Sequence, residues 1–118
     1  MPDLSLRNCI ACEGGIAALS EEERVELLAE LDNSWAYQNA DKHIQREFRF
    51  RNYYQTSAFV NAVIWIAHSE DHHPDIEFGY NRCSIRYSTH AVGGVTENDL
   101  ICAAKINALL ENFTDQAD

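Results

Sequence analysis

The chain has 118 residues, of which 46% are hydrophobic and 24% are charged. This length and balance predict one soluble globular domain with a single hydrophobic core. The formal net charge of −10 excludes a direct nucleic-acid partner, because phosphate binding needs clustered Lys and Arg side chains. No apolar run approaches the length of a membrane span and the N-terminus lacks a secretion signal, so we expect a cytoplasmic protein.

Residues 1–19 are expected to form an irregular N-terminal leader. Cys9 and Cys12 lie in this leader at C-x-x-C spacing. A structural zinc site would need two further ligands at similar spacing, which the sequence does not offer. The pattern therefore indicates two reduced surface thiols, whereas Cys83 and Cys102 lie in apolar segments and are interpreted as small core residues.

The first helix begins at a capping box, in which Ser20 accepts from the amide of Glu23 and the glutamate carboxylate reaches back. Acidic residues in its first turn suit the positive end of the helix dipole. Val25, Leu28 and Leu31 follow at helical spacing, and we expect them on the buried face of this helix.

Two strands are expected next, at residues 35–39 and 43–51. Apolar and polar side chains alternate along the second, which is typical of an antiparallel sheet with one face in water. Asn52 is a suitable N-cap for a second helix, which we expect to end in the segment 68–73. Pro74 supports this ending, because the residue before a proline disfavours helical geometry.

A hairpin of two further strands is expected at residues 75–80 and 82–89, and a last helix begins after it. Thr96 and Asp99 form a second capping box at the start of this helix. That structural role could be the only role of Asp99. A double role is conceivable, because the helix start faces the bend that follows the hairpin.

The order helix, strand, strand, helix, strand, strand, helix predicts an α+β domain. We expect a four-stranded antiparallel sheet with three helices packed on one face. The domain is expected to span residues 20–113, and residues 114–118 form a polar tail.

Histidines gather in one part of the sequence. Three of the five lie between His68 and His73, and His90 follows the last expected strand. Histidine has the unperturbed pKa closest to neutrality, so such a cluster favours proton transfer or metal binding. The hairpin brings the start of one strand beside the end of the other, so we expect His72, His73 and His90 to line one cleft.

Three interpretations of this cluster remain open. His68 and His72 would share a helical face if the helix extended that far, which favours a metal site completed by His90 or a carboxylate. General acid–base catalysis without metal needs only hydrogen-bond reach and a near-neutral pKa. Solvated loop residues are the third interpretation, and the favoured one for His43. The carboxylates that could orient an imidazole or raise its pKa are Glu70, Asp71, Asp75 and Asp99.

The sequence resembles the pterin-4a-carbinolamine dehydratase family. The resemblance covers roughly residues 20–112 and includes an eighteen-residue spacing from the first to the last histidine of the motif. The motif consists of His72-His73-Pro74, an aromatic residue shortly after, Ser88-Thr89-His90, Gly93-Gly94, and an Asp nine residues after His90.

The resemblance implies a reaction and a set of site residues. The reaction is the dehydration of 4a-hydroxytetrahydropterin to quinonoid dihydropterin, which recycles the tetrahydrobiopterin used by aromatic amino acid hydroxylases. No metal and no cofactor are used, since the pterin is the substrate. Family members form dimers or tetramers, and some animal members also bind a homeodomain transcription factor as a dimerisation cofactor. The implied catalytic residues are His72, His73 and His90, and the implied pterin-lining residues are Asp71, Pro74, Ser88 and Thr89.

Our hypothesis is that His72 and His90 transfer protons and that His73 positions the pterin, with Glu70 and Asp99 as candidate orienting carboxylates. Many family members carry a carboxylate at the position of His68 in this chain. Some also carry Trp at the position of Ile76 and Cys at the position of Val92. These departures remove no proton-transfer group but change the polarity of the expected pocket.

A binding module without catalysis is the alternative from another functional class, and a histidine-ligated metalloprotein is a third. In the binding module the same fold would bridge helices of a partner protein. Ile101, Ile106 and Leu109 lie off the expected core stripe of the last helix, so we expect part of this set to form an oligomer interface.

Overall fold

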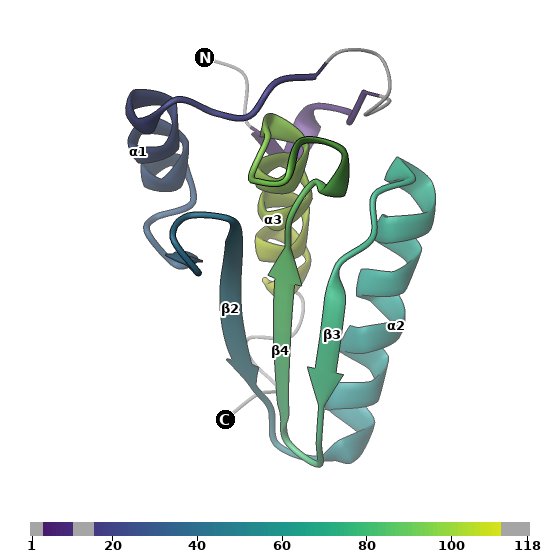
Figure 1. Cartoon of the computed structure of the whole chain (residues 1–118). Coiled ribbons are helices and arrows are strands. Elements are labelled where there is room, and N and C mark those ends of the chain that lie inside the picture. The colour runs from purple at the N-terminus through teal and green to yellow at the C-terminus, as the bar shows by residue number, and fades with distance from the viewer. Residues whose placement is uncertain (1–3, 11–15, 112–118) are drawn as a thin grey trace.

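The computed structural model describes residues 4–10 and 16–111 and shows an α+β architecture. The strands form one antiparallel sheet in the order β1-β2-β4-β3, with α2 and α3 on the same side of it (Figure 1). The predicted fold class, with three helices and four antiparallel strands, is confirmed. In chain order the elements are η1 (Leu4–Leu6), α1 (Glu21–Glu30), β1 (Ala36–Gln38), β2 (His43–Arg49), α2 (Tyr53–Glu70), β3 (Asp75–Phe78), β4 (Arg82–Tyr87), η3 (His90–Val92) and α3 (Glu97–Leu110).

The helices begin where the capping residues predict. The Ser20 hydroxyl accepts from the Glu23 amide at 3.2 Å, and the Glu23 carboxylate accepts from the Ser20 amide at 2.9 Å. The backbone hydrogen bond from Ser20 lowers the pKa of Glu23. Asn52 caps α2 by accepting from the Gln55 amide at 2.9 Å. Each cap satisfies amides that the first turn of a helix leaves without a partner.

The core lies between the sheet and the two helices on its inner face. Ile44 and Phe48 of β2 point inward, opposite Tyr87 and Cys83 of β4 in the antiparallel register. All four side chains are at most 3% exposed, and Phe59 of α2 packs its ring 4.8 Å from that of Phe48. The outer face of the sheet is polar, as the alternation predicted. No helix among the described residues has the length and apolarity needed to cross a membrane.

One expected core residue of α1 is on the surface. Val25 is 67% exposed, whereas Leu31 is 2% exposed and Leu27 and Leu28 pack against the core. The helix lies at the edge of the sheet, near the start of β2, and therefore buries only a narrow stripe (Figure 1). Leu27, which the sequence spacing did not select, is partly buried against the core instead.

The predicted oligomer interface on α3 is wrong for two of its residues. Ile101 is 1% exposed, Ile106 is fully buried, and Leu109 packs against the same core. The N-terminal segment belongs to the same core, because η1 packs against α3 and Leu4 is only 1% exposed. The chain itself therefore covers the face that was expected to receive a partner.

The N-terminal segment also changes the interpretation of the cysteines. Cys9 is only partly exposed, and its sulfur lies 3.6 Å from the sulfur of Cys102 on α3. Cys9 is thus a free, partly exposed thiol, as predicted, but it packs against α3 and is not part of a loose leader, while Cys12 lies outside the described residues. Cys83 and Cys102 are buried, as predicted.

Candidate functional site

The end of α2 directs the histidine segment toward α3. Asp71 adopts the left-handed conformation, with φ 52° and ψ 44°. Its amide donates to the carbonyl of His68 at 3.3 Å, and the amide of His72 donates to the carbonyl of Ala67 at 3.1 Å. This pair of bonds is a Schellman motif, which ends a helix and reverses the direction of the chain. Pro74 follows and leads into β3.

The reversal buries His72 against the start of α3. Its side chain is 7% exposed, and its Nε2 lies 2.6 Å from Oδ1 of Asp99, a carboxylate with no exposed surface. The other oxygen of Asp99 accepts from the Thr89 hydroxyl at 2.8 Å and from the Thr96 amide at 2.9 Å. The Thr89 and Thr96 hydroxyls are themselves 2.8 Å apart. Asp99 thus joins η3, α3 and the His72 loop through one side chain.

Two opposing effects set the protonation of His72. Burial on its own lowers the pKa of this imidazole, but the hydrogen bond that it donates to Asp99 and the negative charge of Asp99 outweigh burial, so the pKa of His72 is raised above its ordinary value. The ring also stacks on Tyr87, with centroids 5.6 Å apart and planes 5° apart. A stacked, hydrogen-bonded imidazole has little freedom to rotate, and the raised pKa favours its protonated form near neutral pH.

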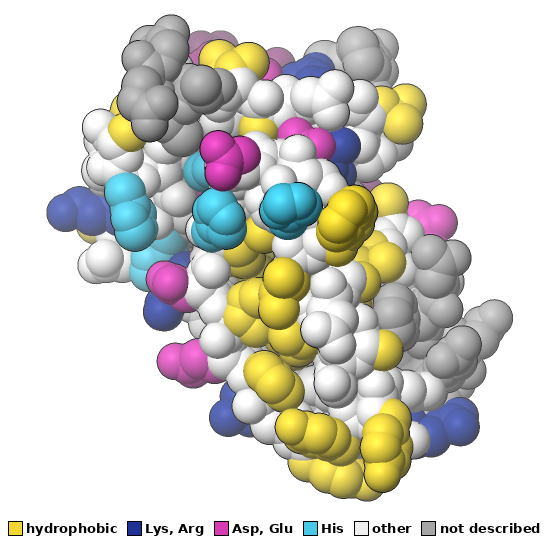
Figure 2. Space-filling model, turned by 90° about the vertical axis from the view of Figure 1, so that its right-hand side faces the viewer, with side chains coloured by type: hydrophobic (Ala, Val, Ile, Leu, Met, Phe, Trp, Pro, Cys, Tyr) yellow, Lys and Arg dark blue, Asp and Glu magenta, His cyan; other side chains and the backbone are white. Residues whose placement is uncertain are grey.

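The other two motif histidines lie at the surface. His73 and His90 are exposed, and each directly follows a buried member of the network, His72 or Thr89. The Thr89 amide donates to the Gly94 carbonyl at 2.8 Å, which closes the loop that carries His90. Figure 2 shows the histidine side chains gathered on one face, with acidic side chains beside them and an apolar strip next to them. Chain connectivity thus ties His73 to His72 and His90 to Thr89, and the grouping of all three histidines in one cleft stays a prediction.

The predicted lining residues divide into two groups. Asp71 is exposed and Pro74 and Ser88 are partly exposed, so all three reach the surface beside the histidines. Thr89 is 1% exposed and instead holds Asp99. Thr89 therefore lies below the surface that His73 and His90 occupy.

Of the two candidate orienting carboxylates, Asp99 contacts a histidine and Glu70 contacts other groups. One oxygen of Glu70 accepts from the Cys9 amide at 2.7 Å, and the other lies 3.7 Å from Nζ of Lys105. Glu70 therefore fastens the N-terminal segment to the end of α2. Because Glu70 directly precedes the loop that carries His72, it connects the N-terminal segment to the candidate site.

Sequence reasoning missed two residues of this region. Tyr87 was not considered as a site residue, although its ring stacks on that of His72. His43 was interpreted as an isolated surface residue, but it precedes Ile44, which pairs with Tyr87, so it lies at the same end of the sheet as the motif. Its pKa is lowered by burial and by the charge of Arg86. The pairing of β2 with β4 could have located His43, but the sequence did not predict which strands are neighbours in the sheet.

The helical metal pair considered from the sequence does not form. α2 ends at Glu70, so His72 lies beyond the helix and does not share a face with His68. His68 remains on the helix surface, with its ring 5.4 Å from that of Trp65. Within residues 4–10 and 16–111, no group of three or more His, Cys, Asp or Glu side chains is arranged to hold a metal ion.

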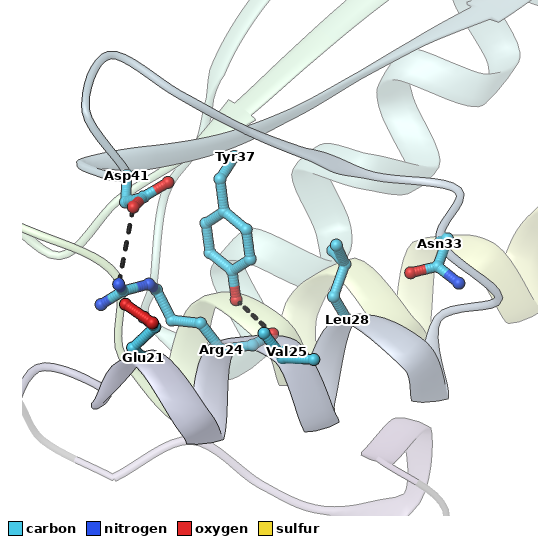
Figure 3. Close-up of a pocket in the computed structure, with 7 residues that line it drawn as sticks. All are labelled: Glu21, Arg24, Val25, Leu28, Asn33, Tyr37 and Asp41. Carbon is cyan, nitrogen blue, oxygen red and sulfur yellow. Dashed lines mark hydrogen bonds and ion pairs between the residues drawn. The ribbon is translucent and has the colours of Figure 1, made fainter.

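A separate hollow of about 230 Å³ lies between α1 and the β1–β2 turn (Figure 3). Arg24 and Asp41 form an ion pair of 3.5 Å across it, and the Tyr37 hydroxyl donates to the Arg24 carbonyl at 3.1 Å. Burial raises the pKa of Tyr37 to about 12. The hollow is below the roughly 300–1,000 Å³ of ordinary ligand pockets and contains no histidine, so we assign it no site. Its lining residues are Glu21, Arg24, Val25, Leu28, Asn33, Tyr37 and Asp41.

Comparison with known sequences identifies relatives over nearly the whole chain. The sequence pattern of the family described as pterin 4 alpha carbinolamine dehydratase matches residues 17–109. A protein of Nitrosomonas eutropha named "Putative pterin-4-alpha-carbinolamine dehydratase" is 56% identical over 108 residues, covering 92% of this chain and 94% of the relative. A protein of the same name from Legionella pneumophila is 51% identical, covering 92% of this chain and 96% of the relative.

Two solved structures are similar to this fold. One is a crystal structure of a transcriptional coactivator/pterin dehydratase from Brucella melitensis, with a TM-score of 0.74 and 35% identity, covering 78% of this chain and 97% of that chain. The other is a pterin dehydratase-like protein identified as a RuBisCO assembly factor in the alpha-carboxysome. It has a TM-score of 0.56 and 30% identity, and the match covers 64% of this chain and 88% of that chain.

Proposed function

This chain belongs to the pterin 4 alpha carbinolamine dehydratase family, and from that premise we propose that it dehydrates 4a-hydroxytetrahydropterin to quinonoid dihydropterin. The observation that carries the proposal is the buried His72–Asp99 pair, which lies directly before the exposed His73 in the chain, on a protein whose histidines gather on one face (Figure 2). The reaction removes water, so the C4a oxygen must gain a proton while a ring nitrogen loses one. A protonated imidazole and a neutral one are suited to these two transfers.

The proposed division of roles follows from burial and charge. His72 acts as the acid, because Asp99 favours its protonated form; Nε2 faces Asp99, which leaves Nδ1 for the substrate. His90 acts as the base, because it is exposed and lies on the loop closed between Thr89 and Gly94. His73 positions the pterin, and Asp71, Pro74 and Ser88 border the same surface. No metal and no cofactor take part in the proposed reaction.

This activity suggests a biochemical setting. Aromatic amino acid hydroxylases produce the 4a-hydroxylated pterin, so the proposed enzyme acts in tetrahydrobiopterin recycling, in the cytoplasm. The uncatalysed dehydration is already feasible. Positioned acid–base catalysis typically contributes about 10²–10⁴-fold in rate, which is therefore enough to account for the proposed activity.

The test is the dehydration of freshly generated 4a-hydroxytetrahydropterin, followed by ultraviolet absorbance. We expect the wild type to exceed the spontaneous rate clearly and His90→Ala to fall toward that rate. His68→Ala is the matched control, since His68 lies on the outer surface of α2 beside Trp65, and it should retain the wild-type rate. A wild type no faster than the spontaneous reaction, or an unimpaired His90→Ala, would overturn the proposal.

Protein binding by the same fold is the second candidate function, and an apolar strip favours it. Ile64 and Trp65 on α2 are 50% and 66% exposed, and Phe78 and Tyr80 at the edge strand β3 are 43% and 64% exposed. Tyr53 connects the two elements, with its ring 6.3 Å from Phe78 and 6.5 Å from Tyr80. An exposed apolar surface beside an unpaired strand edge is typical of a protein interface.

We propose that a second copy of this chain covers the strip, giving a dimer or a tetramer. Light scattering of the wild type should then report an oligomer. Trp65→Glu should dissociate it, whereas Val25→Glu, at an equally exposed apolar residue of α1, should not. A monomeric wild type would exclude this assembly and leave the strip available to another protein.

A further inference from the structure

The N-terminal segment of residues 4–10 forms a strap across α3. Leu4 is buried against the helix, and Nζ of Lys105 donates to the Ser5 carbonyl at 2.8 Å. Arg7 pairs with Glu97 at 2.9 Å. These contacts hold the strap along the part of α3 that begins at the proposed site.

The far end of the strap is held by a side chain of α3 as well. The Ile10 amide donates to Oδ1 of Asn98 at 3.1 Å, and Nδ2 of Asn98 donates to the Ile10 carbonyl at 2.8 Å. The Cys9 amide donates to Glu70 at 2.7 Å. Three hydrogen bonds thus fix the backbone on both sides of the Cys9 side chain.

These contacts place Cys9 directly over Cys102. The two sulfur atoms are 3.6 Å apart, although the residues are 93 positions apart in the chain. Cys9 is partly exposed and Cys102 is fully buried. The arrangement joins an accessible thiol to a buried one, at a separation that a small movement of the strap would close to a covalent bond.

We propose that Cys9 and Cys102 are a thiol–disulfide site, which a small disulfide such as oxidised glutathione converts to an intramolecular disulfide. The Cys9 thiolate attacks one sulfur of oxidised glutathione, forming a mixed disulfide and releasing one glutathione thiolate. The Cys102 thiolate then attacks Cys9 Sγ, forms the protein disulfide and expels the second glutathione thiolate. The two thiol protons end on the two glutathione molecules, so the protein loses two hydrogen atoms and oxidised glutathione gains them.

The surroundings of Cys102 suit the second step. In the reduced protein the hydrogen bond with Cys9 and the positive charge of His72 lower the pKa of Cys102 against the opposing effect of burial. Once Cys9 is in the mixed disulfide that hydrogen bond is gone, and the charge of His72 still favours the attacking thiolate of Cys102. The same hydrogen bond raises the pKa of Cys9, so little of its thiolate is present at neutral pH and the first attack, by the accessible sulfur, is slow. Cys83 has no such neighbour, and burial raises its pKa to about 11. Cys102 and Cys83 are therefore both buried, yet only Cys102 is placed for exchange.

The site lies next to the proposed catalytic histidine. The charges of Cys102 and Asp99 act on both Tyr87 and His72, and Tyr87 stacks on the His72 ring. A disulfide removes the thiol that Cys102 presents to this pair and locks the strap to α3. This coupling to activity rests on the proposed function, whereas the formation of the disulfide does not.

The first test treats the full-length reduced protein with oxidised glutathione, blocks the remaining thiols by alkylation, and maps the linked peptides by mass spectrometry. We expect a loss of two hydrogen atoms and a Cys9–Cys102 linkage. A Cys9–Cys12 linkage would overturn the proposal, because the sequence offers that pair at C-x-x-C spacing. A glutathione adduct that persists on Cys9 would overturn it as well.

Matched variants separate the site from general oxidation. Cys102→Ser should stop at the glutathione adduct of Cys9, while Cys83→Ser and Cys12→Ser should form the same disulfide as the wild type. The oxidised wild type should also unfold at a higher temperature than the reduced protein, because the bond closes a loop of 93 positions in the unfolded chain. An unchanged or lower unfolding temperature would show that the linkage is not compatible with this fold. The disulfide is assayed without substrate, so its failure and the failure of the dehydratase proposal are distinguishable.

Discussion

Replacing Asp99 by Asn tests the proposed control of His72 most directly. The two side chains have nearly the same shape, so the change removes charge and one acceptor without opening a cavity. Asp99 is fully buried and accepts hydrogen bonds from His72, Thr89 and Thr96. With the charge gone, burial is the main remaining influence on the imidazole, and the pKa of His72 should fall below its ordinary value of 6.5.

The expected magnitude follows from the contacts. A hydrogen bond to a charged group typically contributes about 1.5–3 kcal/mol, and breaking a buried pair by removing one partner typically costs about 3–5 kcal/mol. The asparagine keeps one acceptor oxygen, and His72 can lose its proton to relieve the unpaired charge. We therefore expect a loss of about 3 kcal/mol in the free energy of unfolding at about pH 6.

The sign of the pH dependence is fixed by the direction of the shift. In the wild type the folded-state pKa of His72 is raised, so the pair contributes fully below the ordinary pKa of 6.5 and loses its contribution as pH rises through the raised value. In the variant the lowered pKa makes His72 destabilising at the acidic end of that range. The difference between the two proteins should therefore shrink from about pH 6 to about pH 9.

Urea unfolding at several pH values measures the stability difference, and the NMR titration of the imidazole protons measures the pKa of His72. Glu97→Gln is the matched control, because Glu97 lies in the same helical turn but its side chain is 48% exposed. Its exposed pair with Arg7 should change stability by less than about 1 kcal/mol at any of these pH values. A pH-independent difference for Asp99→Asn, or an unchanged titration of His72, would refute the reasoning.

Three further substitutions test separate contacts by urea unfolding. Tyr87→Phe should change stability by less than about 1 kcal/mol, because among the described residues the buried hydroxyl of Tyr87 has no partner other than the weakly accepting sulfur of Cys102; a larger loss would contradict this. Thr89→Val should cost about 1–3 kcal/mol, since Asp99 loses a buried donor, and a neutral result would remove Thr89 from the network. Leu4→Ala should cost about 2–5 kcal/mol if the strap is part of the core, whereas Leu6→Ala, at a residue that is 78% exposed, should cost little.

Local patterns in the sequence predicted the elements well because their causes are local. The capping residues Ser20 and Asn52 mark the observed starts of α1 and α2, since each side chain satisfies amides only two or three residues away. Alternation along β2 predicted its buried and exposed faces. It did not predict Arg46, which shares the inner face, donates to Asn107 of α3 at 2.8 Å and lies 4.6 Å above the Phe48 ring.

The candidate site shows the same division. The sequence grouped His72, His73 and His90 through one motif and one expected hairpin, and the pairing of Asp75 with Arg86 and of Phe78 with Cys83 confirms that hairpin. It could not choose between Glu70 and Asp99 as the carboxylate that orients His72. That choice depends on the left-handed turn at Asp71, which directs His72 toward Asp99 on α3. Glu70, before the turn, instead contacts the strap through the Cys9 amide.

The sequence by itself determined the order of the elements and the family, and it selected the histidines of the candidate site. Only the tertiary structure decided which of these side chains are buried, because burial depends on what covers a face after the chain has folded. The strap illustrates this, since residues 4–10 pack along α3, add Leu4 to the core that contains Ile101 and Ile106, and bring Cys9 onto Cys102. Hydrophobic periodicity describes the face of one helix, and it carries no record of a distant segment that packs there.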